Sequence, residues 1–83
     1  MNDQSTVSLI SQAATRAGCA YAVRALQHNL TQRAEHYAIQ AADEVMRELA
    51  DEVPNDVDAR AAAHWMAYRV FSAAFTFVIE THQ

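Results

Sequence analysis

One Pro and one Gly among 83 residues, against 18 Ala, constrain this chain more than any other feature. Ala has the highest helix propensity, whereas Gly and Pro interrupt helices, so long stretches of the chain favour helix. The sequence therefore predicts an all-α fold. Because 83 residues are too few for two domains, we expect a single domain over residues 1–83, with residues 1–4 disordered.

Three positions are candidates for breaks between helices. Pro54 ends the helix before it, and the Asn or Asp that follows it can cap the next helix. Gly18 is suited to the position just after a helix C-terminus. The third candidate is the segment 28–31, in which Asn29 and Gln32 are spaced like a capping box.

The apolar pattern distinguishes between the last two breaks. A stripe spaced at three and four residues crosses the segment 28–31 without losing phase, whereas the apolar face changes near Gly18. We therefore predict helices at about 5–17, 19–52 and 56–81. The alternative is three helices of similar length with a turn at 28–31.

The third predicted helix carries apolar side chains in two seams. The first seam is Val57, Ala61, His64, Tyr68, Phe71, Phe75 and Val78. The second seam is Ala59, Ala63, Met66, Val70, Ala73 and Phe77. A helix with two apolar seams is buried between at least two neighbours. We predict an antiparallel hairpin around Pro54, resembling a three-helix bundle, with the N-terminal helix packed across it.

Self-association is expected to complete this burial. A domain of this size buries only about 60 % of its unfolded surface, so its stability margin is thin. A homodimer would cover the part of the second seam that a single chain leaves open. The residues predicted to form this contact are Met66, Val70, Ala73 and Phe77.

The charge distribution disfavours some partners. The net charge is −4, and the six basic residues are all Arg and are scattered along the chain. Nucleic-acid binders present clustered basic residues, so direct binding to nucleic acid or to an anionic membrane is disfavoured. The apolar run 70–79 carries no charge and is half the length of a membrane span, which needs about 20 residues. With no secretory signal pattern, we expect a cytoplasmic protein. Abundant Ala and Arg without Lys favour a bacterial or phage origin.

Few side chains carry a chemical signature, and no catalytic, cofactor-binding or metal-binding residue is predicted. A single Cys forms no internal disulfide, and we interpret Cys19 as a small buried apolar residue. No two His residues have the helical spacing of a metal pair. His64 is interpreted as a core histidine bonded to a backbone carbonyl or to a Tyr; the alternative is a small-molecule or metal site beside His64 and Tyr68.

Trp65 and Arg69 are the pair with the clearest binding signature. Their spacing allows the guanidinium to stack on the indole, and both residue types are enriched at binding hot spots. The alternative places Trp65 over the base of the bundle, with Arg69 paired to a carboxylate. Asp43 and Arg47 occupy the outer face of the long helix, where pairing at four-residue spacing is available. These four residues are the predicted partner contacts.

The sequence thus favours a non-enzymatic protein-binding module, such as an adaptor, chaperone or inhibitor. It has no Gly-rich phosphate loop and no convergent set of titratable groups. One alternative is a nucleic-acid-linked regulator, or an acidic mimic of nucleic acid. The mimic would use Asp43, Glu44, Glu48, Asp51 and Glu52. The other alternative is the small-molecule or metal binder with its site near His64.

Overall fold

The computed structural model describes residues 3–82, with side chains from residue 5, and confirms the all-α fold. Its elements are helix α1 (Asp3–His28), a 3₁₀ turn η1 (Thr31–Arg33), helix α2 (Ala34–Glu48) and helix α3 (Val57–Thr81). The described part of the chain contains no strand. Of the segment 1–4, residues 1 and 2 lie outside the described residues, and α1 begins at Asp3.

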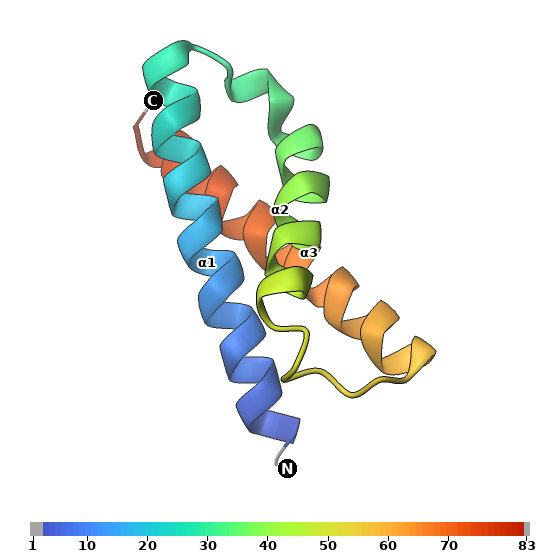
Figure 1. Cartoon of the computed structure of the whole chain (residues 1–83). Helices are drawn as coiled ribbons and strands as arrows, with labels where there is room; N and C mark the ends of the chain where they lie inside the picture. The colour runs from blue at the N-terminus through green and yellow to red at the C-terminus, as the bar shows by residue number, and fades with distance from the viewer. Residues whose placement is uncertain (1–2, 83) are drawn as a thin grey trace.

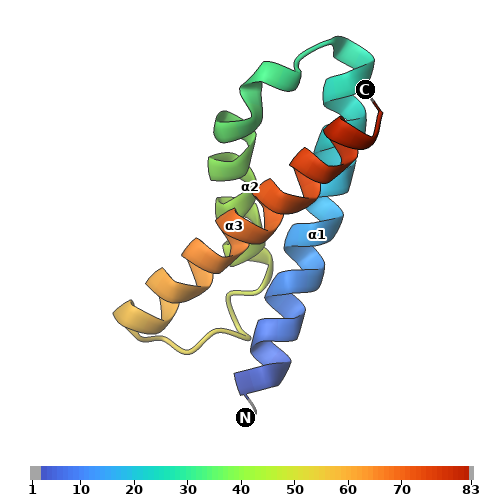
Figure 2. The same ribbon diagram turned by 180° about the vertical axis from the view of Figure 1, so that it is seen from behind.

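Helices α1 and α2 run antiparallel, side by side, and α3 lies obliquely across one face of this pair (Figures 1 and 2). The C-terminal end of α3 lies beside the C-terminal end of α1. The predicted arrangement is therefore corrected in one respect. The hairpin is formed by the first two helices, and the third helix, not the first, packs across it.

The first turn of the chain lies at Asn29, so the predicted bend at Gly18 is wrong and the alternative turn at 28–31 is correct. Asn29 adopts the left-handed conformation, with φ of 58°. The Leu30 amide donates to the Ala25 carbonyl at 2.8 Å, and the Asn29 amide donates to the Leu26 carbonyl at 3.4 Å. This pair of bonds is a Schellman motif, which satisfies the last carbonyls of α1.

Gly18 instead marks a close approach between α1 and α3. A Cβ atom at this position would lie 2.7 Å from the Ala74 Cβ, 2.8 Å from the Phe71 carbonyl oxygen and 3.1 Å from the Phe75 amide nitrogen. The absence of a side chain lets the two backbones approach this closely. Gly18 is thus buried inside a continuous helix.

The second connection follows the prediction at Pro54 more closely. Helix α2 ends at Glu48, and the chain then turns through residues 49–56. Asp56 is the N-cap of α3, because its side-chain Oδ2 accepts a hydrogen bond from the Ala59 amide at 3.0 Å. Of the two expected capping residues, Asp56 is the one used.

The core uses a different spacing from the predicted seams. The buried residues of α3 recur every four positions and are Ala63, Ala67, Phe71, Phe75 and Ile79. On α1 the corresponding buried row is Ile10, Ala14, Gly18 and Ala22. Rows of residues four apart are inclined to the helix axis, and two such rows interlock when helices cross obliquely. The oblique crossing therefore buries this row, whereas Val57, at the start of the first predicted seam, is 83 % exposed.

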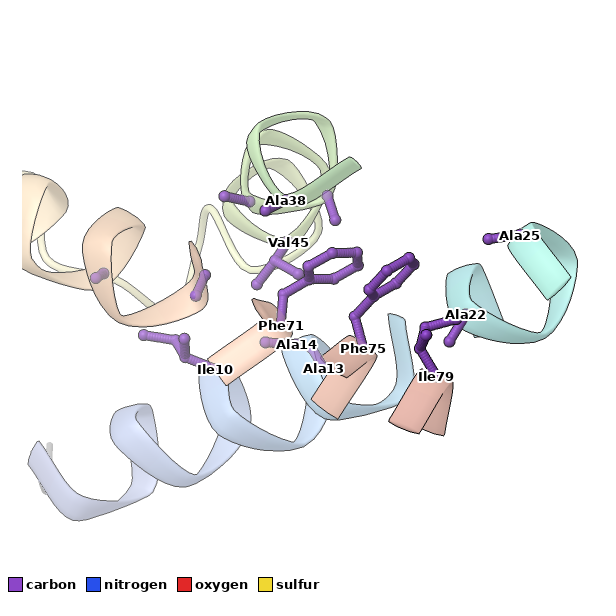
Figure 3. Close-up of a cluster of buried hydrophobic side chains, with 14 of the residues drawn as sticks. Ile10, Ala13, Ala14, Ala22, Ala25, Ala38, Val45, Phe71, Phe75 and Ile79 are labelled. Atoms are coloured by element: carbon purple, nitrogen blue, oxygen red, sulfur yellow. The ribbon is translucent and has the colours of Figure 1, made fainter. Parts of the chain in front are cut away.

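Small side chains fill most of this core. Nine of its fifteen buried apolar residues are Ala, which allows the three helices to pack closely. Phe71 and Phe75 are its largest members and are at most 2 % exposed. In Figure 3 the Phe71 ring lies close to Val45 of α2, the Phe75 ring lies beside that of Phe71, and Ile79 lies beside Ala22 of α1. The two Phe side chains thus supply most of the apolar volume that joins α3 to the hairpin.

Candidate functional site

Beside its buried row, α3 carries a second row of apolar residues that the other helices cover only in part. We call this the outer row. It consists of Ala62, Met66, Val70, Ala73 and Phe77. Met66 and Val70 are half-buried, whereas Phe77 is 70 % exposed. The four residues predicted to mediate self-association all belong to the outer row, and α3 brings them to one surface.

Two shallow apolar grooves meet along this face. The first has a volume of about 320 Å³ and lies between α1, the α2–α3 connection and α3. It is lined by Thr6, Val7, Ile10, Val53, Pro54, Ala59, Ala62, Ala63 and Met66. The second, of about 420 Å³, is lined by Ala62, Trp65, Met66, Arg69, Val70 and Ala73. Ala62 and Met66 line both, so the two grooves adjoin each other at these residues.

Trp65 lies at the edge of the outer row and is 59 % exposed. Its indole stacks on the Tyr68 ring, with centroids 5.5 Å apart and planes at 5°. It does not stack on Arg69 as the spacing predicted; among the described residues, the cation–π pair is Arg24 over Tyr21. Arg69 remains exposed beside it. The ring stack holds Trp65 in a fixed orientation at the surface.

Asp43 is linked to α3 through His64. The His64 Nε2 lies 3.0 Å from the Asp43 Oδ1, with the two side chains 42 % and 56 % exposed. The interpretation of His64 as a core histidine is therefore wrong, because it lies at the surface between α2 and α3. Such exposed pairs contribute little stability. Arg47 is exposed on α2, and within the described side chains it forms no ion pair with Asp43 or Asp51.

The other candidates for chemistry do not assemble into a site. Cys19 is exposed on α1, so its interpretation as a buried residue is wrong. In the part of the chain that the structure describes, no three His, Cys, Asp or Glu side chains lie together as metal ligands would. Beside His64 the structure thus shows a two-residue surface contact with Asp43.

A polar pair between α1 and α2 was missed by sequence reasoning. The Tyr21 hydroxyl donates to the Glu44 carboxylate, 2.8 and 2.9 Å from its two oxygens. The Tyr21 ring also makes edge contacts with Tyr37, at 5.6 Å, and with Phe71, at 5.3 Å. Tyr21 therefore joins all three helices. The turn at Asn29 brings Tyr21 opposite α2. Asn29 was therefore the one local signal in the sequence that could have revealed the Tyr21–Glu44 contact.

The environment of Tyr21 raises its pKa from 10.0 to about 12, through burial first and then the hydrogen bond to Glu44 and its negative charge. Because the folded-state pKa is the higher one, the stabilisation is complete below pH 10 and is lost as pH rises towards 12. We expect a late phase in the ultraviolet phenolate titration that Tyr21→Phe removes. If the titration curves of wild type and Tyr21→Phe have the same shape and differ only in amplitude, this expectation is contradicted.

Comparisons with protein-family models, with curated proteins and with solved structures found no match to this chain. None of the described helices is both long enough and apolar enough to cross a membrane.

Proposed function

We propose that this protein is a non-enzymatic helical module that binds other protein chains and self-associates through the outer face of α3. The observation that carries this proposal is the outer row, in which Ala62 and Ala73 are exposed and the last residue, Phe77, is 70 % exposed. Apolar surface of this kind, when contiguous and continuous with a groove, is typical of protein interaction sites. Grooves of this type accept the apolar face of a helix.

Two surfaces, which overlap at Arg69, support the two kinds of contact. The outer row is suited to a second copy of the chain, because its charge-poor, apolar character matches the core of homodimer interfaces. Trp65 and Arg69 lie at its edge, and both residue types are frequent at binding hot spots. With Asp43 and Arg47 on α2, they form the surface that we propose contacts a different protein.

Site-specific photocrosslinking tests this assignment. We expect a photoreactive phenylalanine at position 65 to give protein adducts in the cells that make this protein. The same group at Val23, which is 48 % exposed on α1, is expected to give none. Adducts of equal yield at both positions, or no adduct at either, would overturn the proposal.

The variant Trp65→Ala provides the matching measurement. We expect it to change the free energy of unfolding by less than about 1 kcal/mol, because the side chain is largely exposed. The protein adducts of a probe at position 69 should decrease in this variant. If Trp65→Ala unfolds the chain, Trp65 is a structural residue and not a contact.

A further inference from the structure

We propose that two copies of this chain pair through α3 in an antiparallel, two-fold symmetric arrangement, with Phe77 of each copy packed over Ala62 of the other. This inference rests on the proposed self-association and specifies its geometry. Its support comes from the order of large and small residues in the outer row and from the grooves beside it.

The outer row reads nearly the same in both directions. Its positions 62, 66, 70, 73 and 77 are separated by four, four, three and four residues. An antiparallel pairing with its two-fold axis beside Val70 therefore aligns position 77 with 62 of the second copy, and position 66 with 73. Such a symmetric contact uses the same surface on both subunits and closes the assembly at two copies.

Side-chain size favours this direction over the parallel one. In the antiparallel pairing, Phe77 meets Ala62 and Met66 meets Ala73, so these two large side chains each face a small one, while Val70 lies beside Arg69 of the second copy. In a parallel pairing, each residue meets its own copy, so Phe faces Phe and Ala faces Ala. Well-packed interfaces interlock large with small residues, and the gaps between facing Ala residues would be unfavourable.

The grooves provide the space that Phe77 requires. Ala62 and Met66 lie where the two grooves join, next to the pocket of about 320 Å³ that extends to Ile10 and Val53. An aromatic side chain opposite Ala62 enters this junction. Phe77 itself lines neither groove, so it is free to act as the inserted side chain.

The charges on this face are consistent with a second copy as the occupant. Arg69 is the only Asp, Glu, Lys or Arg between positions 62 and 77. A highly charged partner would therefore gain little electrostatic attraction from this face. A second apolar face, in contrast, pays little free energy when water is removed from it. The two Arg69 side chains come near the two-fold axis, so we expect the dimer to tighten as salt screens them, from roughly 0.05 to 0.5 M.

Disulfide trapping tests the direction of pairing. In a Cys19→Ser background, Met66→Cys and Ala73→Cys are prepared as separate proteins and then oxidised alone and as an equimolar mixture. We expect the mixture to form the mixed disulfide dimer, identified by its mass, and each protein alone to form little. If the Met66→Cys protein alone forms a disulfide dimer instead, the two helices pair in parallel. That result would overturn the inference while leaving self-association intact.

Light scattering with size-exclusion chromatography tests self-association itself. We expect wild type to have twice the 9.2 kDa chain mass at micromolar concentration. Phe77→Ser should weaken dimerisation by about 100-fold, as expected of an aromatic anchor residue that inserts into the partner, with the helical circular dichroism retained. Val57→Ser, at an 83 % exposed position of the same helix, is the matched control and should remain dimeric. A wild-type monomer at every concentration would overturn both the self-association and the inference, and a dimer insensitive to Phe77→Ser would overturn the inference alone.

Discussion

Gly18→Leu is expected to abolish the folded state, and Gly18→Ala to destabilise it by about 1–3 kcal/mol. Even a single Cβ at this position lies closer to α3 than real Cβ contacts do, at 2.7 Å from the Ala74 Cβ and 2.8 Å from the Phe71 carbonyl oxygen. The backbone of α3 cannot move away without separating Phe71 and Phe75 from the hairpin. This cost exceeds the gain of about 1 kcal/mol in helix propensity that Ala has over Gly.

Urea denaturation followed by circular dichroism measures this effect. Ala20→Leu, at an exposed position of the same helix, is the control and should change stability by less than about 0.5 kcal/mol. If Gly18 were a helix bend without a close neighbour, Gly18→Ala would be neutral or stabilising. That result would contradict the packing of α1 on α3.

Phe71→Ala is expected to cost about 3–5 kcal/mol, because it removes a fully buried ring from the centre of the core. The total stability of a chain of this length is about 4–12 kcal/mol, so a large part of it would be lost. Tyr21 and Phe75 both contact the Phe71 ring, at 5.3 and 5.8 Å, and lose a packing partner.

Thermal and urea unfolding of Phe71→Ala measure the loss. Trp65→Ala is the matched comparison, since it removes an even larger aromatic side chain of α3 from a position that is 59 % exposed. We expect Phe71→Ala to unfold at a far lower urea concentration than Trp65→Ala. Equal effects of the two substitutions would mean that the buried face of α3 is assigned incorrectly.

The sequence by itself determined the local features of this fold. High Ala content with a single Gly and Pro dictated helices, because helix propensity is a property of each residue and its immediate neighbours. The break near Pro54 and the choice of Asn55 or Asp56 as a cap were equally local, since an N-cap bonds to an amide two or three residues away. Four residues of the outer row, Met66, Val70, Ala73 and Phe77, were also identified from their spacing, and the structure leaves them at one surface.

Only the tertiary structure decided which breaks and faces the chain uses. A Gly in a helical pattern is a bend or a close contact depending on what packs against it, and the neighbours of Gly18 are more than fifty residues away in sequence. The predicted seams assumed the alternating four-and-three spacing of nearly parallel helices, whereas the oblique crossing of α3 buries every fourth residue. The Tyr21–Glu44 bond and the surface position of His64 follow from that crossing and from the turn at Asn29. Crossing angles arise from the fit of whole helix surfaces, so no local pattern in the chain specifies them.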